Sequence, residues 1–183
     1  MIRINLDETY APIGVAENLS FITFDSPQRN GAADVLLKIE IKHLEDQLLP
    51  NVYNLSFGPI DEDGEINDSI RCHHENVNKV FSTIILFSLT FLQTHRHATI
   101  GLDGSDDGRA YLYHRMFITN REYLCQFFIS LGVDWYVRLL RNGTVEADTS
   151  GNPFFKPKPE PFDYNRSTRD LYRYYMSHLI PGA

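Results

Sequence analysis

Ala98–Phe117 reads ATIGLDGSDDGRAYLYHRMF, and the rest of the chain is arranged around this stretch. It predicts a short strand, a loop with three glycines, and a helix that opens with an arginine and two tyrosines. Such a junction directs backbone N–H groups and a helix N-terminus at one spot, where a phosphate or carboxylate could bind. The same loop contains Asp103, Asp106 and Asp107, whose charges would repel that anion. The junction is therefore a candidate site, and its sequence alone assigns no function.

Alternating residues before this stretch predict an antiparallel meander of three strands. The strands are expected at about residues 19–25, 34–42 and 51–58. In the second strand every other residue from Val35 to Ile41 is apolar, and the residues between them are mostly charged. This period of two is typical of a strand with one buried face and one face in water.

A long apolar helix is predicted from about Asn76 to Thr94. It is apolar on nearly every side, so other elements must cover it, and we expect it to lie buried against the sheet. Its apolar part, Val80–Leu92, is shorter than the roughly 20 residues of a membrane span. We therefore interpret it as the core helix and expect no membrane association.

The second half of the chain predicts three further elements. Thr119 to Glu122 has the spacing of a capping box, which favours a helix that ends at Gly132. A strand follows, and Asn142-Gly143 favours a type I′ turn into a return strand. The Pro-rich segment 153–161 is interpreted as an ordered coil or a linker. Residues 167–180 have apolar side chains at helical spacing and predict a C-terminal helix.

Together these elements predict a single α+β domain over residues 1–183. The expected architecture is an antiparallel sheet packed on a buried central helix, with two or three further helices. The core is expected within about residues 19–148. The Pro-rich segment 153–161 and the helix 167–180 would form an appended element.

Charge and cysteine content narrow the classes of partner and the cellular location. The net charge is −7, and residues 1–103 contain 15 acidic and 7 basic residues, against 9 acidic and 10 basic in residues 104–183. A nucleic-acid role would thus be confined to the second half, and we regard nucleic acid as the less expected partner. Cys72 and Cys125 are interpreted as reduced thiols, and the first residues lack a secretory signal, so we expect a cytoplasmic protein.

Several segments resemble an uncharacterised bacterial family of unknown function with a loop of the form Gly-Ser-Thr-x-x-Arg-Thr-x-Leu-Tyr. Gly104, Ser105, Arg109, Leu112 and Tyr113 match this pattern, whereas aspartate and alanine stand at 106 and 110 in place of threonines. The segments 53–58 and 79–83 are also similar to the family's strand and helix start. The resemblance implies that the glycine, serine and arginine of the loop form a built feature, and it implies no activity.

The candidate ligand-binding residues lie in this loop and the helix after it. They are Gly104, Ser105, Arg109, Tyr111 and Tyr113. The arginine offers a fork of donors to a phosphate or carboxylate, and a tyrosine could stack on the ligand or hydrogen-bond to it. In the alternative interpretation Ser105 or Asp106 only caps the helix, and Arg109 pairs with a carboxylate of the acidic segment 61–68.

A calcium ion at the loop, or a magnesium ion that bridges two of its aspartates to a phosphate, has partial support, and we expect no cofactor and no metal. Asp103, Ser105, Asp107 and Gly108 match positions one, three, five and six of a calcium loop, but position twelve is His114 and not glutamate. The histidine pairs at 73–74 and 95/97 flank a helix nearly 30 Å long, so they cannot share one metal within a subunit. We interpret these histidines as structural.

The C-terminal segment alternates arginines and tyrosines, residue types that are enriched in interface hot spots. Arg169, Tyr172, Arg173 and Tyr175 are the candidate interface residues. They would contact a protein partner or a second copy of the chain. Alternatively the tyrosines pack the segment on its own domain, or the set stacks on unpaired bases.

These observations favour a non-enzymatic interaction or regulatory protein of a bacterium or its phage. Its anion-binding pocket would lie between Gly104 and Tyr113. The alternative is an enzyme that acts on a nucleotide or nucleic acid, such as the toxin of a toxin–antitoxin pair. That enzyme would use Arg109 for phosphate and Asp106, Asp107 or His114 as the base. A small-molecule sensor is the third interpretation.

Overall fold

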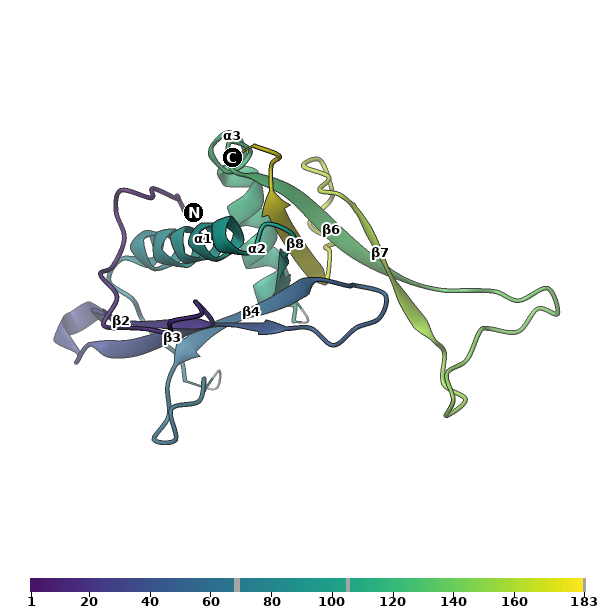
Figure 1. Ribbon diagram of the computed structural model, residues 1–183, viewed down its shortest axis with the longest axis horizontal. Helices are drawn as coiled ribbons and strands as arrows, with labels where there is room; N and C mark the ends of the chain where they lie inside the picture. Colours follow the sequence, from purple (N-terminus) through teal and green to yellow (C-terminus); the bar gives the residue numbers. More distant parts are fainter. Residues whose placement is uncertain (68–69, 105, 183) are drawn as a thin grey trace.

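A computed structural model describes residues 1–67, 70–104 and 106–182. This part of the chain forms an α+β domain with an eight-stranded sheet and three α-helices (Figure 1). The strands are β1 (Gly14–Val15), β2 (Phe21–Ser26), β3 (Val35–His43), β4 (Val52–Pro59), β5 (Thr99–Asp103), β6 (Phe128–Val137), β7 (Phe155–Pro161) and β8 (Tyr174–Leu179). The helices are α1 (Val77–Thr94), α2 (Asp107–Thr119) and α3 (Arg121–Leu124).

The sheet is mixed, with the strand order β1-β2-β3-β4-β5-β8-β6-β7. All neighbouring strands are antiparallel except β4 and β5, which run parallel from Val52/Thr99 to Leu55/Leu102. The predicted meander is confirmed by β2, β3 and β4. Leu37, Ile39 and Ile41 are buried in the main core, as the alternation predicted.

α1 is the predicted core helix, and it begins and ends where the sequence indicated. The Asn76 side chain caps it by accepting a hydrogen bond from the Lys79 N–H at 3.0 Å. By length and composition it is the one helix of the described residues that could cross a membrane. Yet 61% of it is buried inside the protein, because it packs on the sheet and lies in the main core cluster. α1 also connects the parallel strands, so β4, α1 and β5 form a β–α–β unit.

The predicted C-terminal helix at 167–180 is wrong. Residues 174–179 form β8, which lies in the middle of the sheet between β5 and β6. Tyr174 and Met176 pack on one face of the sheet and Tyr175 on the other, so both faces of the strand are buried. A strand buried on both faces loses its alternation, and its apolar positions can then match helical spacing by chance. The C-terminal segment is therefore part of the core and not an appended element.

The predicted helix from Thr119 to Gly132 is also wrong. Only Arg121–Leu124 is helical, and Phe128 begins β6. The capping box does not form, because α2 runs through Thr119 and α3 is preceded by Asn120. The Asn120 side chain instead joins the N-terminal segment, accepting from Ile4 N at 2.8 Å and donating to Ile2 O at 3.1 Å.

The Pro-rich segment forms the edge strand β7, and not a coil or linker. Its prolines at 157, 159 and 161 alternate with residues whose backbone N–H groups can face β6. Phe162, the next residue in this alternation, donates its N–H to Ser130 O at 3.0 Å. Proline has no N–H and is tolerated where that group would point away from the sheet. The prolines thus mark the outer edge of the sheet.

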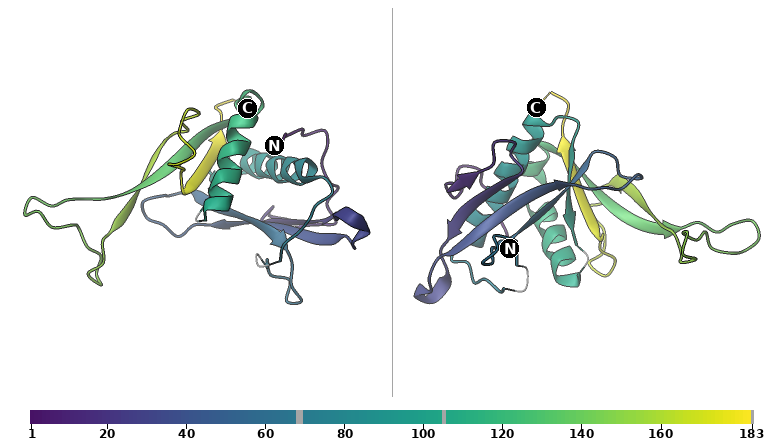
Figure 2. Two further views of the ribbon diagram at one scale, coloured as in Figure 1. Left: turned by 180° about the vertical axis from the view of Figure 1, so that it is seen from behind. Right: turned by 60° about the horizontal axis from the view of Figure 1, so that its bottom comes forward.

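β6 and β7 form a two-stranded ribbon that extends well beyond the helices (Figures 1 and 2). Its far end turns near Asn142 and Gly143, where Leu140 N donates to Thr144 O at 2.8 Å. The turn lies where the sequence predicted it. Its type is not I′, because φ is positive at Gly143 and not at Asn142.

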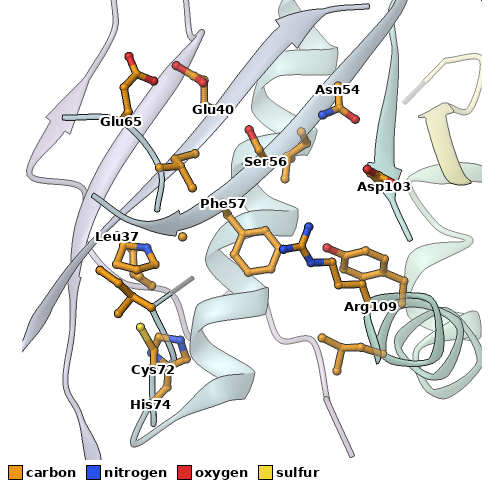
Figure 3. A pocket seen from close by; sticks show the side chains of 17 residues that line it. Leu37, Glu40, Asn54, Ser56, Phe57, Glu65, Cys72, His74, Asp103 and Arg109 are labelled. Atoms are coloured by element: carbon orange, nitrogen blue, oxygen red, sulfur yellow. The ribbon is translucent and has the colours of Figure 1, made fainter. Parts of the chain in front are cut away.

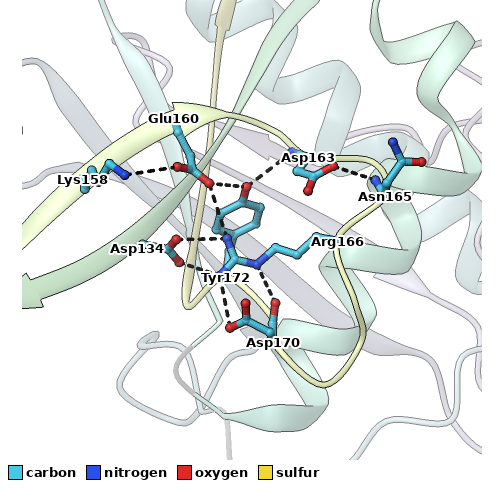
Figure 4. Close-up of polar contacts among 8 residues, drawn as sticks. All are labelled: Asp134, Lys158, Glu160, Asp163, Asn165, Arg166, Asp170 and Tyr172. Atoms are coloured by element: carbon cyan, nitrogen blue, oxygen red, sulfur yellow. Dashed lines mark hydrogen bonds and ion pairs between the residues drawn. The ribbon is translucent and has the colours of Figure 1, made fainter.

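Arg166 fastens the base of this ribbon to the body of the domain (Figure 4). Its guanidinium group pairs with Asp134 of β6 at 2.8 and 3.0 Å and with Glu160 of β7 at 3.5 Å. It also lies over the ring of Tyr172 at 3.8 Å and pairs with Asp170 at 3.2 Å. Burial alone would lower the pKa of Arg166, but its hydrogen bonds to Asp134 and Tyr172 outweigh this effect. The net result is a raised pKa, so Arg166 stays positively charged.

Candidate functional site

A cleft of about 570 Å³ opens where the parallel strands β4 and β5 part (Figure 3). β4 runs on to Pro59, four residues beyond its last pairing with β5 at Leu55. β5 ends at Asp103, and the chain turns at Gly104 into α2. The segment between β4 and α1 closes the far side with Glu65, Cys72 and His74. The carboxyl ends of parallel strands are a common place for ligands to bind.

Gly104 allows the tight turn from β5 into α2. A Cβ atom at this position would lie 3.1 Å from both Ala110 Cα and the ring of Tyr175, closer than side chains normally approach. The Gly104 N–H donates to Arg173 O at 3.0 Å, which fixes the turn against the segment before β8. The predicted strand, loop and helix are therefore all present. Ser105 lies outside the described residues.

The side chains of Asp106 and Arg109 form an ion pair at the start of α2. The Asp106 carboxylate caps the helix by accepting from Arg109 N at 2.8 Å, and its second oxygen lies 3.1 Å from Arg109 Nε. The capping alternative therefore holds for Asp106, and Arg109 forms an ion pair with the same carboxylate. Asp68 of the acidic segment 61–68 lies outside the described residues, so a pairing of Arg109 with that segment stays a prediction. A carboxylate of the protein already occupies the position at which an anion would meet the helix N-terminus.

Arg109 and Tyr113 both line the cleft, one turn apart on α2. Arg109 extends from the helix into the middle of the cleft, toward Phe57 (Figure 3). Tyr113 is 5% exposed, and burial raises its pKa to about 12, so it can only be a neutral hydrogen-bonding group. Tyr111 is 51% exposed and does not line the cleft, because residues two apart point to different sides of a helix.

His74 is a residue of the cleft that the sequence did not indicate. Gln28 fixes its tautomer: the Gln28 Oε1 accepts from His73 N, so the Gln28 Nε2 must donate, and it does so to Ser26 O and His74 Nδ1. The ring proton of His74 is therefore on Nε2. Burial, with a smaller effect from His73, lowers the pKa of His74, so it stays neutral. Ser26 and Gln28 are some 46 residues away in sequence, and no local pattern joins them to His74.

Cys72 and His74 line the same wall, but they do not form a catalytic pair. Burial raises the pKa of the Cys72 thiol, so the thiol form dominates. His74 uses Nδ1 for Ser26, at 2.8 Å, and for Gln28. Ser26 itself has no exposed surface, so a substrate cannot reach its hydroxyl. An activated nucleophile needs a lowered pKa or an adjacent base, and it must be accessible to the substrate. The Cys72 thiol lacks a lowered pKa, and the Ser26 hydroxyl is not accessible.

Among the other candidate catalytic and metal residues, Asp103 lines the cleft, but His114 and Asp107 do not. His114 has no exposed surface, so it cannot be the base of the alternative enzyme or a calcium ligand. Asp107 pairs with Arg173 at 2.7 Å on the surface. Within residues 1–67, 70–104 and 106–182, no group of three or more His, Cys, Asp or Glu side chains could hold a metal ion.

The candidate interface residues fall into two groups. Tyr172 and Tyr175 have no exposed surface, so they cannot contact a partner on the folded domain. Tyr172 packs on Gly132, and Tyr175 donates its hydroxyl to Ala110 O at 2.8 Å. Their packing on the domain is the alternative that the sequence left open. Arg169 and Arg173 are at the surface, and their part in an interface stays a prediction.

A model of a family of unknown function (DUF6934) matches residues 7–139. The chain belongs to this family. The DUF6934 match begins before β1 and ends just after β6, so it includes the β4–α1–β5–α2 unit that builds the cleft. No curated protein and no solved structure matches the chain.

Proposed function

We propose that the protein is a small-molecule-binding, regulatory protein, and that its ligand carries an anionic group which Arg109 recognises. One observation carries this proposal: the Arg109 guanidinium reaches into a cleft of about 570 Å³ at the carboxyl ends of two parallel strands. This volume is within the range of about 300–1,000 Å³ that ligand pockets have. The arginine and second tyrosine of the resembled loop motif line this cleft, and its glycine forms the turn from β5 into α2.

The wall of the cleft offers polar groups on several sides of a ligand. His74 is neutral and has its ring proton on Nε2, and Tyr113 is a neutral hydroxyl. Leu37 and Phe57 supply apolar surface. Glu40 lies at the rim: burial raises the pKa of Glu40, but hydrogen bonds from Lys42 and Lys38 outweigh this and lower it. Because the two lysines neutralise Glu40, it opposes an anion less than its charge suggests.

Binding is favoured over chemistry because the potential nucleophiles are either inaccessible or held as thiol. Ser26 is closed off, and Cys72 has a raised pKa. An effector site needs only differential affinity for its ligand, which the charged and hydrogen-bonding groups of the cleft can supply. The ligand would then change the stability or the association of the protein.

The competition between Asp106 and a bound anion provides the test. Asp106→Asn keeps the helix cap, because asparagine caps as well as aspartate, but removes the charge that competes for Arg109. We expect this variant to bind an anionic ligand more tightly, and Arg109→Gln to bind it at least about tenfold more weakly. Arg96→Gln is the matched control, since Arg96 is exposed beyond the far end of α1.

The measurement is a thermal-shift screen of nucleotides, sugar phosphates and small carboxylic acids, followed by calorimetric titration of each hit. A ligand that binds the native state raises the melting temperature by mass action. The proposal fails if no anionic compound stabilises the protein, or if the stabilisation persists in Arg109→Gln. Turnover of a hit by the wild-type protein would replace it with the enzyme interpretation.

A further inference from the structure

The β6–β7 ribbon has one face that is apolar along its whole length. The pairing of the two strands places Trp135 opposite Pro157 and Val137 opposite Phe155 on this face. Toward the base the face continues through Val133, opposite Pro159. Trp135 is 43% exposed and Phe155 is 59% exposed. We call this surface the apolar ribbon face.

The charged residues of the ribbon lie on its other face. There Asp134 pairs with Lys158 and Tyr136 with Lys156 in the strand register. This face is held to the body by Arg166 through Asp134 and Glu160. The ribbon therefore projects from a fixed base and presents a surface without charge to the solvent.

Only the base of the apolar ribbon face is covered by the chain itself. Leu44 and Leu49, from the segment between β3 and β4, pack there on Val133, Tyr174 and Met176 as a small second core. Farther out, the described residues leave about half of Trp135 and of Phe155 exposed. With ordinary areas of about 150–250 Å² for an aromatic side chain, the exposed fractions of Trp135 and Phe155 together amount to roughly 200 Å².

We propose that the apolar ribbon face binds the same face of a second copy of this chain, in a two-fold, antiparallel dimer. The aromatic side chains of two such faces bury roughly 400 Å² in total, so the contact is a small one and we expect a weak, reversible dimer. An uncharged face is complementary to itself, as an isologous contact requires. The prolines of β7 remove N–H donors from its outer edge, so further strands cannot add there and the contact closes as a dimer.

Charge complementarity favours the antiparallel arrangement of the two ribbons. At the far end of the ribbon, the turn 138–146 carries Arg138 and Arg141, which are exposed, and Glu146, which pairs with Lys156, while Asp148 lies in the next turn. The segment that covers the base carries Glu45, which is exposed, and Asp46. In an antiparallel dimer the basic end of one ribbon lies beside the acidic segment of the other copy. Opposite charges at the rim of an interface orient the two partners.

A double variant on the apolar ribbon face and a single control variant on the other face test the proposal. Trp135→Ser with Phe155→Ser removes the centre of the apolar ribbon face, and we expect the dimer dissociation constant to rise about tenfold or more. Tyr136→Ser is the matched control, because Tyr136 is 47% exposed but lies on the other face. Its dimer should be unchanged. Circular dichroism melting of each variant shows whether the domain is folded.

The measurement is sedimentation equilibrium of the full chain, without added ligand, from 1 to 100 µM. A charge reversal adds a test of orientation: Arg141→Glu should weaken the dimer, and Glu45→Arg in the same chain should restore it. A monomer at all concentrations, a dimer that survives the double serine variant, or equal loss in Tyr136→Ser would overturn the proposal. Binding of lipid vesicles or single-stranded RNA by a monomeric wild-type protein would overturn it as well. None of these outcomes depends on Arg109 or the cleft.

Discussion

His114 shows how one side chain in the core can set the response of the protein to pH. It has no exposed surface, and neither ring nitrogen has a hydrogen-bond partner among the described residues. Its ring lies among aromatic residues, with the Phe162 ring 5.6 Å away. Burial lowers the pKa of His114 from 6.5, opposed in part by the backbone of Arg166. The imidazole is therefore neutral in the native protein.

We predict that the protein loses stability as the pH falls below 6.5, and that His114→Leu removes much of this loss. Below 6.5 the unfolded chain binds a proton at this histidine while the native protein does not, so protonation favours unfolding. Leucine also removes an unpartnered buried polar group, which costs about 1–3 kcal/mol. Urea unfolding at pH 5.5 and 7.5 measures both effects. His97→Leu, at an exposed position, is the control, and an unchanged pH dependence in His114→Leu would contradict the prediction.

The site was predictable from sequence only where its residues are close in the chain. Gly104, Arg109 and Tyr113 lie within ten residues of one another; the glycine forms the turn into α2, and the other two residues line the cleft from that helix. His74 joins them through the fold, and its tautomer depends on Gln28, which is separated from α2 in sequence by three strands and the helix α1. Such a contact leaves no periodic or local signal.

β8 shows why the elements of the second half were harder to predict than β2, β3 and β4. One face of β3 is more exposed to water than the other, so apolar and polar residues alternate in its sequence and identify it as a strand. β8 is covered on both faces, by the main core on one side and by Leu49 and Val52 on the other. Buried residues therefore follow one another along β8, and its sequence shows no alternation of apolar and polar residues. Sequence patterning thus identified the strands with one polar face and missed β8, whose two faces are both buried.

We predict that Tyr175→Ala in β8 lowers the free energy of unfolding by about 3–5 kcal/mol, as large-to-small changes of buried aromatic residues do. Tyr175 has no exposed surface and stacks on Phe117 at 5.8 Å. Tyr111→Ala is the control, because that side chain is half exposed on α2, and it should change the stability by less than about 0.5 kcal/mol. Chemical denaturation measures both values. A small effect at Tyr175 would mean that β8 can leave the sheet.

At the scale of the whole molecule, the domain consists of a helix-covered body and a ribbon that projects from it. The main core lies between the sheet and its helices, and the ribbon beyond β8 has no helix on it. Arg166 joins these parts, with a side chain that is only 11% exposed. Ion pairs held in this way maintain a geometry more than they add stability.

We predict that Arg166→Gln loosens the ribbon without unfolding the body. The variant should lose about 1–3 kcal/mol, because Asp134 and Glu160 lose their partner but are partly screened by water. Hydrogen exchange should accelerate in residues 134–161 and stay slow in α1. Arg173→Gln serves as the control, since both members of its pair with Asp107 are exposed. Uniform acceleration across α1 and the ribbon would show that the two parts unfold together.

The central place of β8 has a consequence for the synthesis of the protein. β5 is complete at residue 103, but its second neighbour begins at residue 174, and β6 waits for the same strand. A ribosome that adds about 5–20 residues per second needs several seconds to reach it. Over the part of that interval after residue 137, once β6 is made, the nascent chain carries two unpaired strand borders, the kind of surface that chaperones shield. The last strand to be translated is thus the one that closes the sheet.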